Sequence, residues 1–298
     1  MNIYSAISAN KIRTWVICVL FVIFITTIVY VFSKALGYSG LSYAGFALIV
    51  SGFMSMGSYY YSDKLVLASV KARKIEKKDN PLLYRTVENL AIGNGLPLPT
   101  IYIINDESPN AFATGRNPKH AVLCVTSGLL SILNKVELEG VISHELSHIK
   151  NYDIRLMSIV AILVGSIAII ADLFLRNMWF RSNNNERSNN VQIVFIILGI
   201  FFAIISPIIA TVIQLAISRK REYLADASGA LLTRYPEGLA SALVKISGYP
   251  RSLRTASNAT AHLFIANPFK GKDTKKMFSS LFETHPPIED RIRILRTM

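Results

Sequence analysis

Long hydrophobic runs alternate with polar, charged segments along this chain. Four runs carry at most one charged residue each and are long enough to cross the roughly 30 Å hydrocarbon core of a bilayer as helices. These runs cover about residues 15–33, 37–60, 156–175 and 192–217. They come in two pairs, so the pattern predicts an N-terminal membrane hairpin over residues 1–62 and a second membrane hairpin over residues 154–218.

Two of these assignments have alternatives. The first run can also be a cleavable signal peptide, but it is long for one and no clear small-x-small cleavage site follows it. The last two runs can also form a buried hairpin of a soluble protein. Their length favours membrane spans, although the loop at 176–190 holds three Arg residues against one Glu, which conflicts with a position outside the cytoplasm.

The polar segments predict a small soluble domain made of two parts, residues 63–153 and 219–298. Its strands are indicated by β-branched residues at Thr100–Asn105 and Ala121–Ser127. Between them, Glu107–Arg116 is rich in small residues with Pro and Gly, which predicts an irregular segment at an edge. The fold class is therefore α+β and mainly α-helical, with four transmembrane helices and a small β-sheet in the soluble domain.

The pattern His-Glu-x-x-His occurs at His144, Glu145 and His148. Residues four apart share one helix face, so the two imidazole rings can bind one metal ion, and Glu145 can take a proton from a water activated there. An exposed helix that carries two unrelated histidines is the alternative, and it is the weaker one because the chain has only 5 His. No Pro or Gly follows before the third run, so we expect the motif helix to continue into the membrane span.

A catalytic zinc site usually has three protein ligands and one open position, so the motif requires a third ligand. Glu222 and Asp226 follow the fourth run and lie four residues apart, on one helix face. Antiparallel spans would bring them to the same membrane surface as the motif. The sequence therefore predicts one zinc ion per chain, held by His144, His148 and Glu222, with Asp226 accepting the other N–H of a ligating histidine. A solvated helix face is the alternative.

Composition supports a membrane protein, since 51% of residues are hydrophobic and 17% are charged. The formal net charge is +13, and a basic cluster follows the second run, which places that flank in the cytoplasm. We expect a lipid bilayer as partner and no nucleic acid, because no zinc-finger or RNA-binding signature accompanies the charge. Cys18 and Cys124 have no metal-ligand spacing and are compatible with a reducing compartment.

Five segments together resemble the HtpX family, bacterial membrane-integral zinc metalloproteases related to the CAAX prenyl proteases. These segments are 144–153, 221–226, 110–115, 259–265 and 284–292. The resemblance covers essentially the whole chain. It implies a zincin-like (gluzincin) catalytic domain that faces the cytoplasm from the bacterial inner membrane, with His144, His148 and Glu222 as zinc ligands and Glu145 as general base.

The same resemblance suggests that the segment from Asn110 to Thr114 lies along the cleft as a substrate-binding edge. An extended peptide can bind such an edge as an added strand, which reads main chain and tolerates many sequences. An ordinary loop before a strand is the alternative. The candidate substrate-binding residues are Asn110, Ala111, Phe112 and Ala113.

A developing oxyanion needs a donor besides the metal. His285 is the best candidate, with Arg291 behind it as a supporting residue of the metal site, although a histidine before two prolines can simply precede a helix. We expect His120 to be a surface residue and His262 to be a buried core histidine.

The resemblance to the HtpX family implies a stress-linked quality-control endopeptidase that cleaves damaged or misfolded membrane proteins or other unfolded polypeptides. A narrow-specificity processing protease of the CAAX type is the first alternative, although it should have more membrane spans. A non-enzymatic membrane scaffold with structural zinc is the second, although structural zinc normally has four protein ligands and does not need Glu145.

Overall fold

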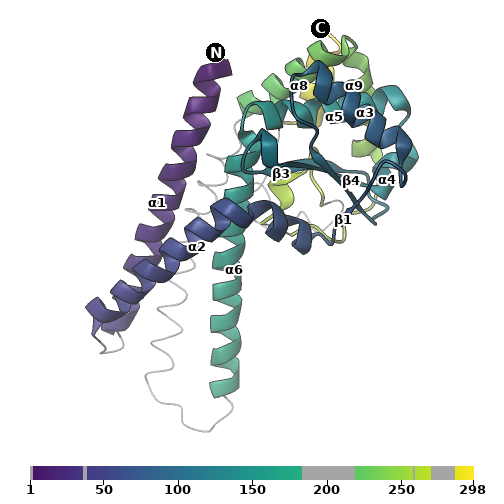
Figure 1. Cartoon of the computed structure of the whole chain (residues 1–298). Helices are drawn as coiled ribbons and strands as arrows, with labels where there is room; N and C mark the ends of the chain where they lie inside the picture. Colours follow the sequence, from purple (N-terminus) through teal and green to yellow (C-terminus); the bar gives the residue numbers. More distant parts are fainter. Residues whose placement is uncertain (1–2, 36–38, 183–218, 258, 270–285) are drawn as a thin grey trace.

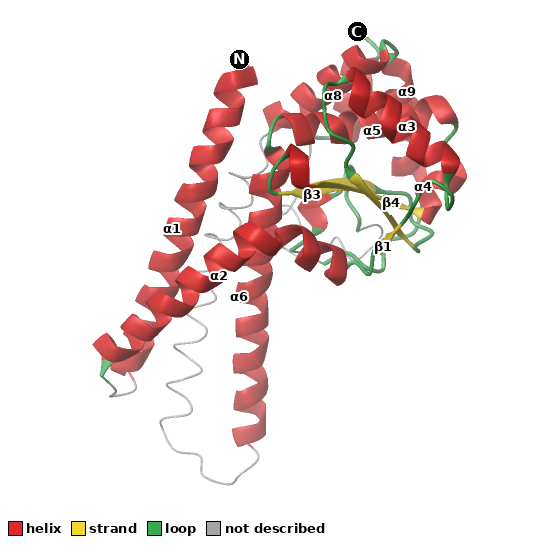
Figure 2. Cartoon of the chain, in the orientation of Figure 1, coloured by secondary structure: helices red, strands yellow, loops and turns green. Residues whose placement is uncertain are grey.

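The computed structural model describes residues 3–35, 39–182, 219–257, 259–269 and 286–298 (Figure 1). The predicted fourth membrane run and His285 lie outside these residues. Within them, long helices extend away from a domain in which further helices surround a small sheet (Figure 2). The α+β, mainly helical class is confirmed for the described part of the chain.

The N-terminal hairpin consists of α1 (Ile3–Ala35) and α2 (Gly40–Ser69), which pack against each other and against α6 (Asp153–Ser182). In the described part of the chain, two segments are long and apolar enough to span a membrane, Ser8–Thr27 of α1 and Gly40–Ser69. Many large apolar side chains of α1 and α2 are exposed, as expected for surfaces that face lipid. The third predicted run lies within α6.

Within the described residues, four strands form one sheet in the order β1-β2-β4-β3. Strands β1 (Arg73–Lys74) and β2 (Thr100–Ile104) are antiparallel, β2 and β4 (Ala121–Thr126) are parallel, and β4 and β3 (Ala111–Gly115) are antiparallel. The two predicted strands are therefore confirmed to within one residue at each end. Strand β3 pairs with β4 on one side only, which makes it an edge strand.

The prediction of an irregular segment before β4 was wrong for its second half, because residues 111–115 form the regular strand β3. Small side chains such as Ala111 and Ala113 lack strand propensity, but they allow close packing. All five residues of β3 are buried, and the strand contacts α2, α5 and α6. Tertiary packing therefore outweighs local propensity here.

Helix α5 (Lys135–Lys150) is the centre of the domain and packs against β3, α3 (Pro81–Gly93), α8 (Arg219–Thr233) and α9 (Pro236–Gly248). The remaining helices among the described residues are the short α4 (Ser127–Ile132), α10 (Ile288–Leu295) and the 3₁₀ turns η1 (Pro118–His120) and η2 (Ala261–Leu263). A Cβ atom at Gly140 would lie 2.6 Å from the backbone nitrogen of Leu239, so α5 and α9 approach as closely as their backbones allow.

The motif helix does not continue into the membrane span, and our expectation of one helix was wrong. Helix α5 ends at Lys150, Tyr152 adopts φ 60°, and α6 begins at Asp153. A left-handed conformation is unfavourable for a bulky residue and needs support from its surroundings. The cations of Lys11 and Arg155 lie 5.0 and 5.1 Å from the centre of the Tyr152 ring and provide such support.

Candidate metal centre

Helix α5 brings His144 and His148 to the same buried face, one turn apart. The helix begins with a capping box in which Asn134 and Glu137 satisfy each other's backbone N–H groups, and this fixes the register of the motif. The two Nε2 atoms lie 3.2 Å apart. Both rings are almost fully buried, so water does not separate them from the surrounding charges.

Helix α8 supplies Glu222 to the same point. Its carboxylate oxygens lie 3.8 Å from Nε2 of His144 and 3.5 Å from Nε2 of His148. The ligand atoms of the three residues all lie within 4.8 Å of one another. Gly229 allows α8 to approach α5, because a Cβ atom there would be 3.0 Å from the backbone nitrogen of His144. The structure thus brings the three predicted ligands together.

The second ring nitrogen of each histidine contacts a carboxylate. Nδ1 of His144 lies 2.9 Å from Asp226, and Nδ1 of His148 lies 3.0 Å from Asp153. A carboxylate accepts a proton donor, so each Nδ1 carries a hydrogen, which leaves each Nε2 as the nitrogen available to a proton or a metal ion. Two such nitrogens and a carboxylate that converge in this way attract positive charge.

The charges around the cluster and its dimensions fit a divalent metal ion. Burial by itself lowers the pKa of His148, but Asp153 and Glu222 outweigh it and raise this pKa to about 9. Ligand atoms 2.0–2.1 Å from a tetrahedral zinc ion would lie about 3.3 Å apart. The observed separations of 3.2, 3.5 and 3.8 Å are close to that value.

Asp226 is itself fixed by Arg291 of α10. The guanidinium donates through Nε and Nη2 to the two carboxylate oxygens at 2.8 and 2.7 Å, and through Nη1 to the carbonyl oxygen of Ile265 at 2.9 Å. Burial alone raises the pKa of Asp226, but the charge and hydrogen bonds of Arg291 reverse this and hold it at about 2. Arg291 is fully buried, and its hydrogen bonds to Asp226 give it the supporting position that we predicted.

Glu145 points from α5 towards the edge strand. Burial is the main cause that raises the pKa of its carboxyl group, and Glu222 adds to it. His148 and the N–H of Ala113, which donates to the carboxylate, act in the opposite direction, and the net pKa is about 7. The side chain is 2% exposed. A carboxyl group in this setting can both accept and return a proton near neutral pH.

The predicted substrate-binding residues differ in their surroundings. Asn110 is buried and donates from Nδ2 to the carbonyl oxygen of Ala266 at 3.0 Å, and Phe112 is fully buried against the ring of Phe264. Neither side chain is presented to a substrate. Ala111 accepts a hydrogen bond from the N–H of Ile265, so that part of the edge is covered, whereas the N–H of Ala113 faces Glu145.

The other histidines agree with the predictions where the structure describes them. His120 is exposed and contacts Asn117 and Arg116. His262 is buried, and its Nε2 lies 2.9 Å from the carbonyl oxygen of Met157, as expected for a core histidine. The predicted oxyanion residue His285 lies outside the described residues.

Asp153 was not predicted as the partner of His148. Asp153 is five residues after His148, and on a continuous helix it would not lie on the histidine's face. The break at Tyr152 turns its carboxylate back towards His148. The only signal in the sequence was an acidic residue close behind the motif.

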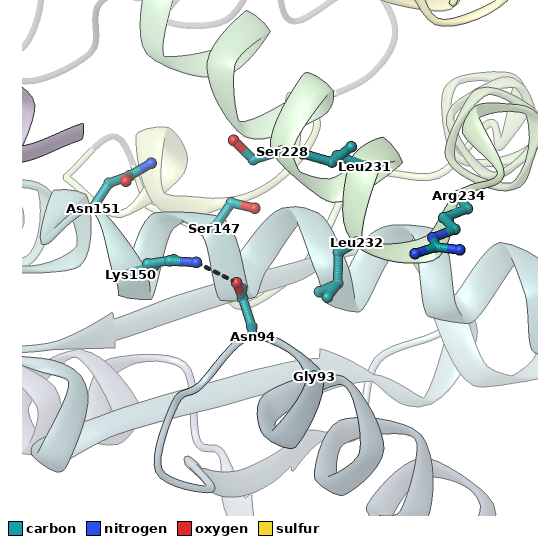
Figure 3. Close-up of a pocket in the computed structure, with 9 residues that line it drawn as sticks. All are labelled: Gly93, Asn94, Ser147, Lys150, Asn151, Ser228, Leu231, Leu232 and Arg234. Carbon is teal, nitrogen blue, oxygen red and sulfur yellow. Dashed lines mark hydrogen bonds between the residues drawn. The ribbon is translucent and has the colours of Figure 1, made fainter. Parts of the chain in front are cut away.

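A separate surface pocket of about 350 Å³ lies between the end of α3, α5 and α8 (Figure 3). On α5 it is lined by Ser147, Lys150 and Asn151, and Lys150 donates a hydrogen bond to the side chain of Asn94 at 2.8 Å. Among its described lining residues there is no metal ligand, and Glu145 is absent too. The pocket is therefore distinct from the metal centre.

Comparisons with known proteins agree with this arrangement. The model of Peptidase family M48 matches residues 77–298. A protein named Protease HtpX homolog from Tropheryma whipplei (strain Twist) is 46% identical over 99% of this chain and 98% of its own. A protein of the same name from Caldanaerobacter subterraneus subsp. tengcongensis is 43% identical over 100% of this chain and 98% of its own.

A crystal structure of S. mikatae Ste24p has a TM-score of 0.49 at 16% identity and covers 95% of this chain and 67% of the other, a similarity too low to carry an argument about the site. The family match spans most of the chain and includes His144, His148 and Glu222. On these matches, the chain belongs to Peptidase family M48.

Proposed function

We propose that this chain is a zinc-dependent endopeptidase of the bacterial cytoplasmic membrane that cleaves damaged or misfolded membrane proteins. One observation carries the proposal. The Nε2 atoms of His144 and His148 converge with Glu222 on one point, directly beside the buried carboxyl group of Glu145. Peptide hydrolysis by a metal-activated water requires metal ligands with a proton acceptor beside them, and these residues provide both.

When zinc is bound, it lowers the pKa of water towards about 7 and polarises a carbonyl group. Glu145 accepts the proton of the attacking water and later returns it to the leaving amine, for which a pKa near neutrality is suited. Asp226 and Asp153 keep the protons of the two histidines on Nδ1, so that both Nε2 atoms remain free for the metal. We assign the further donor for the oxyanion to His285 on the basis of the sequence motif alone.

The outer edge of β3 is the proposed binding site for the substrate. The N–H and C=O groups of one strand residue point to the same side, so the carbonyl of Ala113 faces the same edge as its N–H. An extended peptide paired with this edge would take over the N–H of Ala113 that donates to Glu145 in the structure, and its main chain would lie directly beside that carboxyl group. Main-chain recognition of this kind is compatible with many sequences, which suits the removal of misfolded proteins.

The proposed location follows from α1, α2 and the basic residues after α2. Both helices include segments able to span a membrane, and the positive charges that follow favour a cytoplasmic catalytic domain. Substrates are then membrane proteins or unfolded chains that reach the cytoplasmic surface. The alternative of a CAAX-type processing protease would use the same metal centre with a narrower substrate range.

The alternative of a scaffold with structural zinc is less well supported. Structural zinc sites normally have four protein ligands, whereas the described part of the chain places three at this point. A scaffold also has no use for a buried carboxyl group beside the metal, whose burial is unfavourable when it ionises.

The test is cleavage of a disordered reporter protein by detergent-purified, zinc-loaded chain. Glu145→Gln should bind zinc and lose cleavage. Glu139→Gln, on the same helix but partly exposed in an ion pair with Lys135, is the matched control and should cleave like wild type. If wild type and Glu145→Gln both bind zinc and cleave equally, Glu145 is not the base and the proposal fails.

A further inference from the structure

The N-terminal membrane helix makes a direct contact with the metal centre. Asn10 of α1 is 2% exposed, and its Nδ2 atom donates to Asp153 Oδ1 at 2.7 Å and to the carbonyl oxygen of Asn151 at 3.0 Å. Both partners accept hydrogen bonds, so the orientation of the amide group is fixed by them. The other oxygen of Asp153 holds Nδ1 of His148 at 3.0 Å.

We propose that Asn10 is a positioning residue of the metal centre, which acts on His148 through Asp153. Because the metal is part of the proposed function, this assignment rests on that function. It makes α1 a component of the catalytic unit in addition to a membrane anchor. It also gives the two histidines equivalent supports, since Arg291 fixes Asp226, which holds His144 in the same way.

The contact spans the corner between α5 and α6. Asn10 binds the carbonyl at the end of α5 and the carboxylate at the start of α6, on either side of the left-handed residue Tyr152. The next residue of α1, Lys11, lies over the ring of Tyr152. Two consecutive residues of α1 therefore hold the corner that directs Asp153 towards His148.

Charge strengthens this arrangement. Hydrogen bonds to a carboxylate are stronger than those between neutral groups, and burial increases the difference. Arg221 of α8 also approaches Asp153, with Nε at 3.7 Å from Oδ1, a longer distance than that of Asn10. Asn10 is thus the closer of these two donors to the oxygen that does not face His148.

The experiment measures the zinc dissociation constant of the full-length, detergent-purified protein by competition with a chromophoric chelator. Removal of a partner behind a metal ligand typically weakens binding by about 10–100-fold, so we expect about tenfold for Asn10→Ala. Thr14→Val is the matched control. Thr14 is as buried on α1, but its hydroxyl bonds only to the α1 backbone in the described structure, at the carbonyl oxygen of Asn10. The control should remain within about twofold of wild type.

A double-mutant cycle tests the route through Asp153. If Asn10 acts through that carboxylate, Asn10→Ala should cause no further loss in an Asp153→Ala background. Full multiplication of the two losses would overturn the assignment. The assignment would also be overturned if Asn10→Ala kept the wild-type zinc affinity while the melting temperature of the metal-free protein fell as in Thr14→Val. Asn10 would then contribute to packing alone.

Asn10→Leu is the second variant if Asn10→Ala does not fold, since leucine has the same branching at Cγ and suits a membrane helix. It should show the same loss of zinc affinity, and wild-type affinity in this variant would equally overturn the assignment. If the wild-type protein binds no zinc at all, the proposed function itself is contradicted. That outcome is distinguishable from failure of the Asn10 assignment, in which wild type still binds zinc.

Discussion

Replacing Glu145 by glutamine should stabilise the metal-free protein above neutral pH. Burial raises the pKa of this carboxyl group from 4.5 to about 7. Between these two pH values the folded protein retains a proton that the unfolded chain has released, so stability falls as pH rises through this window. Above pH 7 the loss is complete, and a difference of about 2.5 between the pKa values corresponds to about 3 kcal/mol.

Glutamine cannot ionise and its side-chain oxygen can still accept the hydrogen bond from Ala113, so Glu145→Gln avoids this loss. We expect the metal-free variant to exceed wild type by up to about 3 kcal/mol at pH 8 and to match it near pH 4.5. The assay is thermal unfolding in detergent with a metal chelator, at a series of pH values. The control Glu139→Gln, at a partly exposed site, should show no such pH-dependent gain.

Bound zinc should reduce the gain, because a cation beside the carboxylate favours its ionised form. Glu145→Gln should therefore be more stable than wild type without metal, should exceed wild type by less when zinc is bound, and should be inactive in cleavage. A gain of equal size at pH 5 and pH 8 would refute the reasoning, since it would show that ionisation of Glu145 is not the source. A stability at pH 8 no higher than that of wild type would refute it as well.

The remaining predictions concern the ligands and the packing around them. Glu222→Ala should lose stoichiometric zinc in elemental analysis, and Asp226→Ala should weaken zinc binding by about 10–100-fold in chelator competition, because one removes a ligand and the other its support. Arg291→Met should destabilise the protein by about 3–5 kcal/mol in thermal unfolding, since it removes the cationic partner of the buried carboxylate of Asp226. Gly140→Ala should cost about 1–3 kcal/mol in the same assay, because its methyl group would clash with the backbone at Leu239.

The cluster of candidate metal ligands could be predicted because its geometry is mostly local. His144 and His148 need only a helix to share a face, and the structure provides that helix with a capped start. Glu222 was predicted from its place after a hydrophobic run, and α8 does bring it to the two histidines. The run that precedes it lies outside the described residues, so the hairpin used in that prediction stays a prediction.

The edge strand could not be predicted from its residues alone. Two alanines and a glycine among residues 111–115 weaken the strand signal that Phe112 and Thr114 give, and the segment gains its regularity from pairing with β4 and from burial beneath three helices. The same burial explains why the side chains of Asn110 and Phe112 pack in the interior of the domain. A sequence shows which residues are near the site, but it does not show which face of a strand they occupy until its pairing is known.

The break after the motif helix shows how a distant part of the chain decides local structure. From Lys150 to Asp153 no Gly or Pro stops a helix, and propensity alone predicts continuation. Arg155 and Lys11 lie over the ring of the left-handed Tyr152, and Asn10 donates to the carbonyl of the residue before it, so two of its three supports come from α1, more than a hundred residues earlier. If the chain continued as one helix, Asp153 would turn away from His148, and the imidazole would lose the acceptor that fixes its proton on Nδ1. Helix α1 therefore contributes to the chemistry of a site that its own sequence does not contain, and removing it should weaken the metal centre as well as the attachment to the membrane.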